Sequence, residues 1–156
     1  MGGTEFQYVK DAFDSNWIAP AGPHITRFEN NLSKISKDYH IAALSSGTSA
    51  IHLALLLLGI KRADEVLCSS FTFSASANPI TYLGAHPIFI DSESDTWNMC
   101  PELLEKAIID RVSKRGTPKA IMLVHLYGMP AKMDEIMHIA NKYEISVIED
   151  AAEALG

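Results

Sequence analysis

Residues 42–53 read Ala-Ala-Leu-Ser-Ser-Gly-Thr-Ser-Ala-Ile-His-Leu, so a short apolar stretch passes through small hydroxylated residues into a second apolar run. The pattern predicts a strand that turns directly into a helix. N–H groups in the first turn of a helix have no intrahelical acceptor, and together with the helix dipole they attract phosphate. Gly47, Thr48 and Ser49 are therefore candidate phosphate ligands. Ser and Thr are also ordinary N-caps, and from these residues alone plain capping is the commoner interpretation.

Short apolar stretches and helical patterns alternate along the rest of the chain. Strands are predicted over residues 41–44, 65–68, 87–90, 119–126 and 145–148. Helices are predicted over residues 48–58, 73–83, 101–114 and 131–143. Alternation at intervals of about thirty residues is typical of βαβ units, so the sequence predicts an α/β fold with three layers around a mostly parallel sheet. Functional residues are then expected at the carboxyl ends of the strands.

The first forty residues have a different pattern. Two amphipathic helices are predicted over residues 4–15 and 25–39, separated by the turn-rich stretch 16–23. We therefore expect residues 1–40 to form a helical arm and residues 41–156 to form the first part of a larger domain.

Composition narrows the classes of partner. The chain has 156 residues, 47% of them hydrophobic, and a formal net charge of −6, which disfavours nucleic acid or an anionic membrane as partner and favours a small metabolite. Cys68 and Cys100 lack the spacing of a zinc site or a disulfide framework, so no metal is expected and a reducing cytoplasm fits best. The longest apolar run, residues 51–60, is too short to span a bilayer.

Three features at the predicted strand ends suit one ligand. Neither GxGxxG nor GxxxxGK[ST] is present, whereas Phe73 follows the second predicted strand and Asp150 follows the fifth. With phosphate at residues 47–49, Phe73 would stack on an aromatic ring and Asp150 would hold a protonated ring nitrogen, as pyridoxal 5′-phosphate (PLP) requires. The alternatives are that Asp150 is a helix cap and Phe73 a core residue.

Several separate motifs, in the same order, resemble the DegT family of sugar aminotransferases. They are SSGTSAIHLAL at 45–55, SFTFSASAN at 70–78, YLGA at 82–85, VHLYG at 124–128 and IEDAAEALG at 148–156. The stretch NWIAP at 16–20 is similar to the arm of the bacterial branch that makes amino sugars for surface glycans. The resemblance covers almost the whole chain.

The resemblance implies part of the large domain of the type I PLP-dependent aminotransferase fold, in an enzyme that works as a homodimer with active sites at the subunit interface. It implies a nucleotide-linked keto-sugar substrate and an amino-acid donor. Thr48 and Ser49 would bind the cofactor phosphate, and Phe73 would stack on the ring. Asp150, the predicted catalytic residue, would pair with the pyridine nitrogen. Glu153 would lie near the ring hydroxyl, where many relatives have His or Gln.

One part of the family pattern is not matched. The catalytic lysine of the family follows the Asp150 motif, and no lysine of this sequence corresponds to it. Lys142 falls on a predicted surface helix and Lys132 at the start of that helix. We therefore expect this polypeptide to be an inactive N-terminal part of the enzyme, and leave open whether it binds PLP. Two alternatives stay open, a PLP-dependent sugar dehydratase of the same family and a non-catalytic binding module with this fold.

Overall fold

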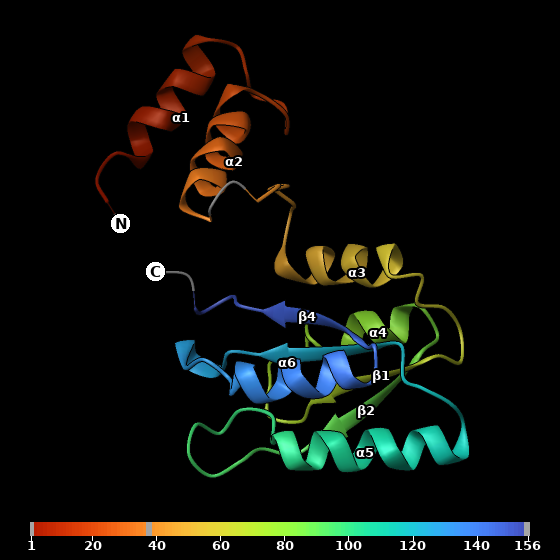
Figure 1. The fold of residues 1–156 in the computed structure, drawn as a ribbon. Helices are drawn as coiled ribbons and strands as arrows, with labels where there is room; N and C mark the ends of the chain where they lie inside the picture. The colour runs from red at the N-terminus through yellow and green to blue at the C-terminus, as the bar shows by residue number, and fades with distance from the viewer. Residues whose placement is uncertain (1, 37–38, 155–156) are drawn as a thin grey trace. The chain divides into compact units, whose positions relative to one another are not determined.

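The computed structural model describes residues 2–36 and 39–154. The chain divides into two compact units, one up to Leu44 and the other from Ser45 onward (Figure 1). The first unit contains α1 (Glu5–Asp14) and α2 (Pro23–Ile35). Helix α2 begins with proline at a favoured position and ends earlier than predicted, and residues 37 and 38 of the predicted helix lie outside the described residues.

The predicted strand over residues 41–44 is wrong. This stretch has no ladder partner among the described residues, and the N–H of Ala43 donates to Oε1 of Glu29 at 2.8 Å. A strand needs its backbone groups paired with a neighbouring strand, and here a side chain of α2 takes one of them. The apolar pattern could not show whether a neighbouring strand was present.

The second unit is built on four parallel strands in the order β2-β1-β3-β4, where five had been predicted for the chain. The strands are β1 (Glu65–Ser69), β2 (His86–Ile90), β3 (Ala120–Val124) and β4 (Ser146–Asp150). In the register, Leu67 lies beside Ile88 on one side and Ile121 on the other, and Ile121 lies beside Val147. The carboxyl ends of all four strands therefore meet at one edge of the sheet.

Helices cover both faces of this sheet and give the predicted three layers (Figure 1). They are α3 (Gly47–Leu57), α4 (Asn78–Tyr82), α5 (Pro101–Lys114) and α6 (Met133–Lys142). The helix predicted over residues 73–83 is shorter than expected, because residues 74–77 form turns and Pro79 lies in the first turn of α4, where its missing N–H costs nothing.

Alternate residues of β1 and β3 enter different cores. Leu67 and Ile121 pack with residues of α5 and α6, whereas Val66 and Met122 pack with residues of α3 and α4. Strands buried on both faces explain why the predicted strands read as continuous apolar runs. None of the helices in the described part of the chain combines the length and apolar character that a membrane crossing requires.

Candidate functional site

A cavity of about 560 Å³ lies at the edge of the sheet where the strands end. Its walls come from the start of α3, the loop after β1, the turn after β3 and the end of β4. Of the residues predicted from the sequence, Gly47, Thr48, Phe73, Asp150 and Glu153 line it. Residues that lie up to about a hundred positions apart in the sequence thus line the same cavity.

The first turn of α3 has N–H groups available at this cavity. Ser46 is the N-cap, and its hydroxyl accepts from the N–H of Ser49 at 3.1 Å. The N–H groups of Gly47 and Thr48 have no acceptor among the residues that the structure describes. A Cβ placed on Gly47 would meet nothing within 4 Å, so the space beside this turn is open. The turn therefore combines capping with a free pair of donors.

Ser49 is placed differently from its neighbours. It does not line the cavity, and its hydroxyl lies 3.0 Å from that of Ser46 and 3.2 Å from that of Ser45. Its role as a direct phosphate ligand stays a prediction.

Phe73 projects from the loop between β1 and α4. Its side chain is 79% exposed, so the alternative that it belongs to the core is wrong. The backbone carbonyl of Phe73 accepts a hydrogen bond from the N–H of Ser76 at 3.0 Å, and this bond holds the turn. An exposed aromatic side chain on a fixed turn at a cavity wall is available for stacking on a ring.

Asp150 is the last residue of β4, and its carboxylate is half-buried. Oδ2 accepts from the hydroxyl of Ser76 at 2.7 Å, and Oδ1 accepts from the N–H of Ala152 at 3.3 Å. The contact with the N–H of Ala152 is of the kind that a capping residue makes, so the helix-cap alternative stays a hypothesis beside cofactor binding. Burial and the charge of Asp150 raise the pKa of the Cys68 thiol to about 12, which keeps that buried cysteine protonated.

His125 has a structural part in the site. Its Nδ1 accepts from the N–H of Ala131 at 3.0 Å, so the ring proton lies on Nε2, which donates to Glu149 at 3.1 Å. The residue is 7% exposed. Both ring nitrogens are therefore engaged in holding the turn after β3 against β4.

The turn after β3 carries backbone strain. Tyr127 has φ of 52°, a left-handed conformation that non-glycine residues rarely adopt, and Gly128 follows with φ of 82°. Oε2 of Glu153 accepts from the N–H of Tyr127 at 2.8 Å. One carboxylate oxygen of Glu153 is therefore committed to the turn, which the sequence alone did not indicate.

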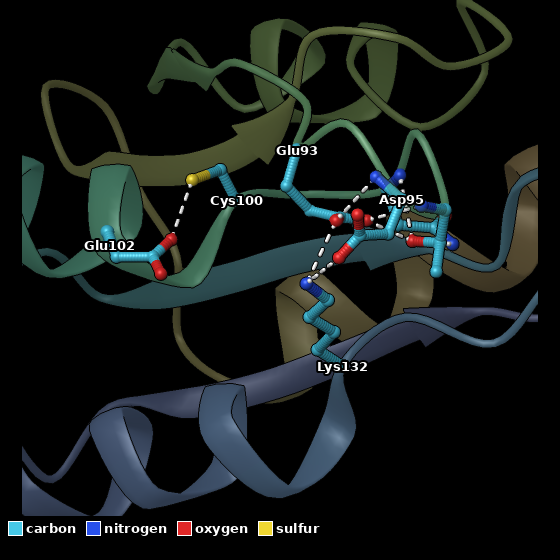
Figure 2. Close-up of polar contacts among 7 residues, drawn as sticks. Glu93, Asp95, Cys100, Glu102 and Lys132 are labelled. Carbon is cyan, nitrogen blue, oxygen red and sulfur yellow. Dashed lines mark hydrogen bonds and ion pairs between the residues drawn. The ribbon is translucent and has the colours of Figure 1, made fainter.

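Lysine 132 lies away from the cavity. Its Nζ contacts Glu93 at 3.0 Å and Asp95 at 2.8 Å, and so ties the loop after β2 to the start of α6 (Figure 2). In the same view the thiol of Cys100 donates to Glu102 at 3.0 Å. Lys142 pairs with Glu105 at 2.7 Å, and no lysine in the described ranges lines the cavity.

Sequence reasoning missed several residues around the cavity. Thr72 and Ser76 were not singled out, because Thr72 precedes the predicted helix over residues 73–83 and Ser76 falls inside it, so their hydroxyl groups were not expected to meet. Phe71 also lines the cavity and meets Trp97 and Tyr127 edge to face, with ring centroids 6.2 Å and 6.4 Å away. No periodicity in the sequence connects three aromatic residues on three separate loops.

Residues 1–156 match the DegT/DnrJ/EryC1/StrS aminotransferase family. The chain is 54% identical, over 100% of its length and 40% of the relative, to EpsN of Bacillus subtilis (strain 168), which is described as a candidate PLP-dependent aminotransferase. It is 44% identical to the GDP-perosamine synthase of Escherichia coli O157:H7, over 99% of the chain and 41% of that protein. The structure of NtdA from Bacillus subtilis with bound pyridoxamine phosphate (PMP) matches with a TM-score of 0.82 and 36% identity, over 95% of this chain and 34% of that one.

The chain therefore spans about 40% of the length of the curated relatives that it matches. The solved relative binds a form of the vitamin B6 cofactor. The open first turn of α3, the exposed ring of Phe73 and the carboxylate of Asp150 are chemically suited to a phosphate, an aromatic face and a ring nitrogen of that cofactor.

Proposed function

The chain belongs to the DegT/DnrJ/EryC1/StrS aminotransferase family, and from this premise we propose that it forms the cofactor-binding part of a PLP-dependent aminotransferase that acts on a nucleotide-linked keto-sugar. The observation that carries the proposal is the shared cavity: the first turn of α3, Phe73 and Asp150 all line it. Three elements that are separate in the sequence thus offer one ligand a phosphate site, a stacking face and an acid.

The phosphate end of the cofactor would be held at α3. Phosphate oxygens can accept hydrogen bonds from the free N–H groups of Gly47 and Thr48 and from the hydroxyl of Thr48. The positive end of the helix dipole adds to the attraction. The hydroxyl of Ser49 lies within hydrogen-bond distance of the hydroxyls of Ser45 and Ser46, and would support the phosphate site through them.

The ring would be held by Phe73 and Asp150. Phe73 would cover one face, and ionised Asp150 would accept a charge-assisted hydrogen bond from the protonated ring nitrogen and keep that proton in place. When bound, PLP supplies an electron sink for amino-group transfer. Glu153, with one oxygen already accepting from Tyr127, would present its other oxygen near the ring hydroxyl.

We propose that the whole protein takes an amino-acid donor and a keto-sugar as substrates and works as a homodimer. The relative named GDP-perosamine synthase supports a nucleotide-linked sugar as the substrate class. Since no described lysine lines the cavity, we expect the 156-residue polypeptide itself to transfer no amino group.

The proposal is tested by binding of PMP to the 156-residue polypeptide, measured by calorimetry. Asp150→Asn removes the charge but keeps the shape, and we expect it to weaken binding at least about tenfold, because a charge-assisted bond becomes a neutral one. Asp91→Asn is the matched control, since Asp91 follows β2 but does not line the cavity. Absence of binding by the unchanged chain, or equal binding by the Asp150 variant, would contradict the proposal.

A further inference from the structure

A chain of hydroxyl groups runs from Asp150 into the loop that carries Phe73. Oγ of Ser76 lies 2.7 Å from Oδ2 of Asp150, and Oγ1 of Thr72 lies 2.7 Å from Oγ of Ser76. Ser76 is fully buried, with 0% of its surface exposed. A buried hydroxyl is stable only with partners, and here both of its partners belong to this chain.

The direction of the protons follows from the chemistry of the carboxylate. An ionised carboxylate can only accept hydrogen bonds, so Ser76 must donate its single proton to Asp150. Ser76 then has only lone pairs left for Thr72, and Thr72 must donate to Ser76. Both hydroxyl protons therefore point toward the negative charge, an arrangement in which each bond polarises and strengthens the next.

The two oxygens of Asp150 are held unequally. Oδ2 accepts the 2.7 Å bond at the end of the hydroxyl chain, whereas the one contact of Oδ1 with the residues that the structure describes is the 3.3 Å bond from the N–H of Ala152. A bond to Oδ2 restricts the rotation of the whole carboxylate, because both oxygens turn together. Oδ1 is thereby the less engaged oxygen, free to form a stronger bond with a ligand.

We propose that Ser76 and Thr72 are positioning residues, which fix the ionised carboxylate of Asp150 for the protonated ring nitrogen of the cofactor. The inference rests on the proposed function. The residues act through Asp150 and not by touching the ring nitrogen. Their effect on binding must therefore depend on whether the ligand has that nitrogen.

The experiment compares two ligands on the 156-residue polypeptide: PMP and its deaza analogue, in which C–H replaces the ring nitrogen. For Ser76→Ala we expect about three- to tenfold weaker binding of PMP and less than a twofold change for the deaza analogue. Ser74→Ala is the matched control, because Ser74 is exposed in the same loop. Circular dichroism checks that each variant is folded.

Thr72 provides a second, independent pair of variants. Thr72→Val keeps the shape and removes the hydroxyl, and we expect the same selective loss for PMP; Thr72→Ser keeps the hydroxyl and should restore binding. Equal losses for both ligands, or no loss for either, would overturn the positioning role while leaving PMP binding by the unchanged chain intact. Failure of the unchanged chain to bind PMP would overturn the proposed function and this inference with it.

Discussion

Gly128 is the residue at which the turn after β3 comes nearest to the end of the chain beyond β4. A Cβ at this position would lie 2.8 Å from the backbone oxygen of Glu153, and its φ of 82° already disfavours any side chain. For Gly128→Ala we expect a loss of unfolding free energy of about 2–4 kcal/mol, because steric overlap adds to the conformational cost. Urea unfolding followed by circular dichroism measures it.

Gly59 separates the two causes. Its φ of 72° is similar, but a Cβ there would meet nothing within 4 Å. Gly59→Ala should therefore cost only the conformational part, about 1–2 kcal/mol. Equal costs for the two variants would mean that the contact with Glu153 is relieved by a small movement and does not constrain the cavity wall.

Single residues of the site differed in how far the sequence could predict them. Asp150 and Phe73 were predictable, because strand ends in an alternating α/β pattern meet at one edge of the sheet. Ser76 was not predictable, because its role depends on a hydrogen bond to Asp150, which lies 74 positions away in the sequence. The hydrogen bond from the N–H of Tyr127 to Glu153 also joins residues far apart in the sequence. In addition, a tyrosine does not indicate a turn with positive φ.

At the scale of elements, the loop between β2 and α5 is held by Glu93. Hydrogen bonding to the Thr96 hydroxyl, and further bonding from Lys132 and nearby N–H groups, lower the pKa of Glu93 from 4.5 to about 2. Since the folded-state pKa lies below that of the unfolded chain, ionised Glu93 stabilises the fold fully above about pH 4.5, and this contribution is lost as pH falls toward 2.

The variant Glu93→Gln tests this contribution. We expect it to lower the free energy of urea unfolding at pH 7, and the difference from the unchanged chain to shrink steadily between pH 4.5 and pH 2. Glu144→Gln, at an exposed position in the turn before β4, controls for the loss of one charge. A difference that stays constant across this range would show that Glu93 holds the loop through its shape and not through its charge.

The elements themselves were predictable to different degrees. The strands β1 and β3 were found because each is a short apolar run buried along its whole length, which is a strong signal. The strands β2 and β4 lie at the two edges of the sheet and are only partly buried, and the shorter apolar stretches 87–90 and 145–148 located them. The run over residues 41–44 gave the same signal, but pairing depends on a neighbour and not on the run itself. The predicted helix over residues 73–83 failed at its start, where the turns over residues 74–77, which carry Ser76, replace helical bonds.

At the scale of the whole molecule, α3 is apolar on more faces than the second unit covers. Ile51 and Leu55 are buried against the sheet, whereas Leu57 is 79% exposed. In the described residues only the inner face of this apolar helix lies in the core. Exposed apolar surface of this kind favours association of polypeptides in water.

We therefore expect the 156-residue polypeptide to self-associate with increasing concentration, and Leu57→Lys to shift it toward the monomer, because a charge at the centre of an apolar contact must be desolvated. Sedimentation velocity over about a hundredfold range of concentration measures the effect. Ser113→Lys adds the same charge at an exposed polar position on α5 and should leave the association unchanged. An unchanged chain that stayed monomeric throughout would contradict the expected self-association. Equal dissociation by both lysine variants would show that net charge, and not the outer face of α3, controls the association.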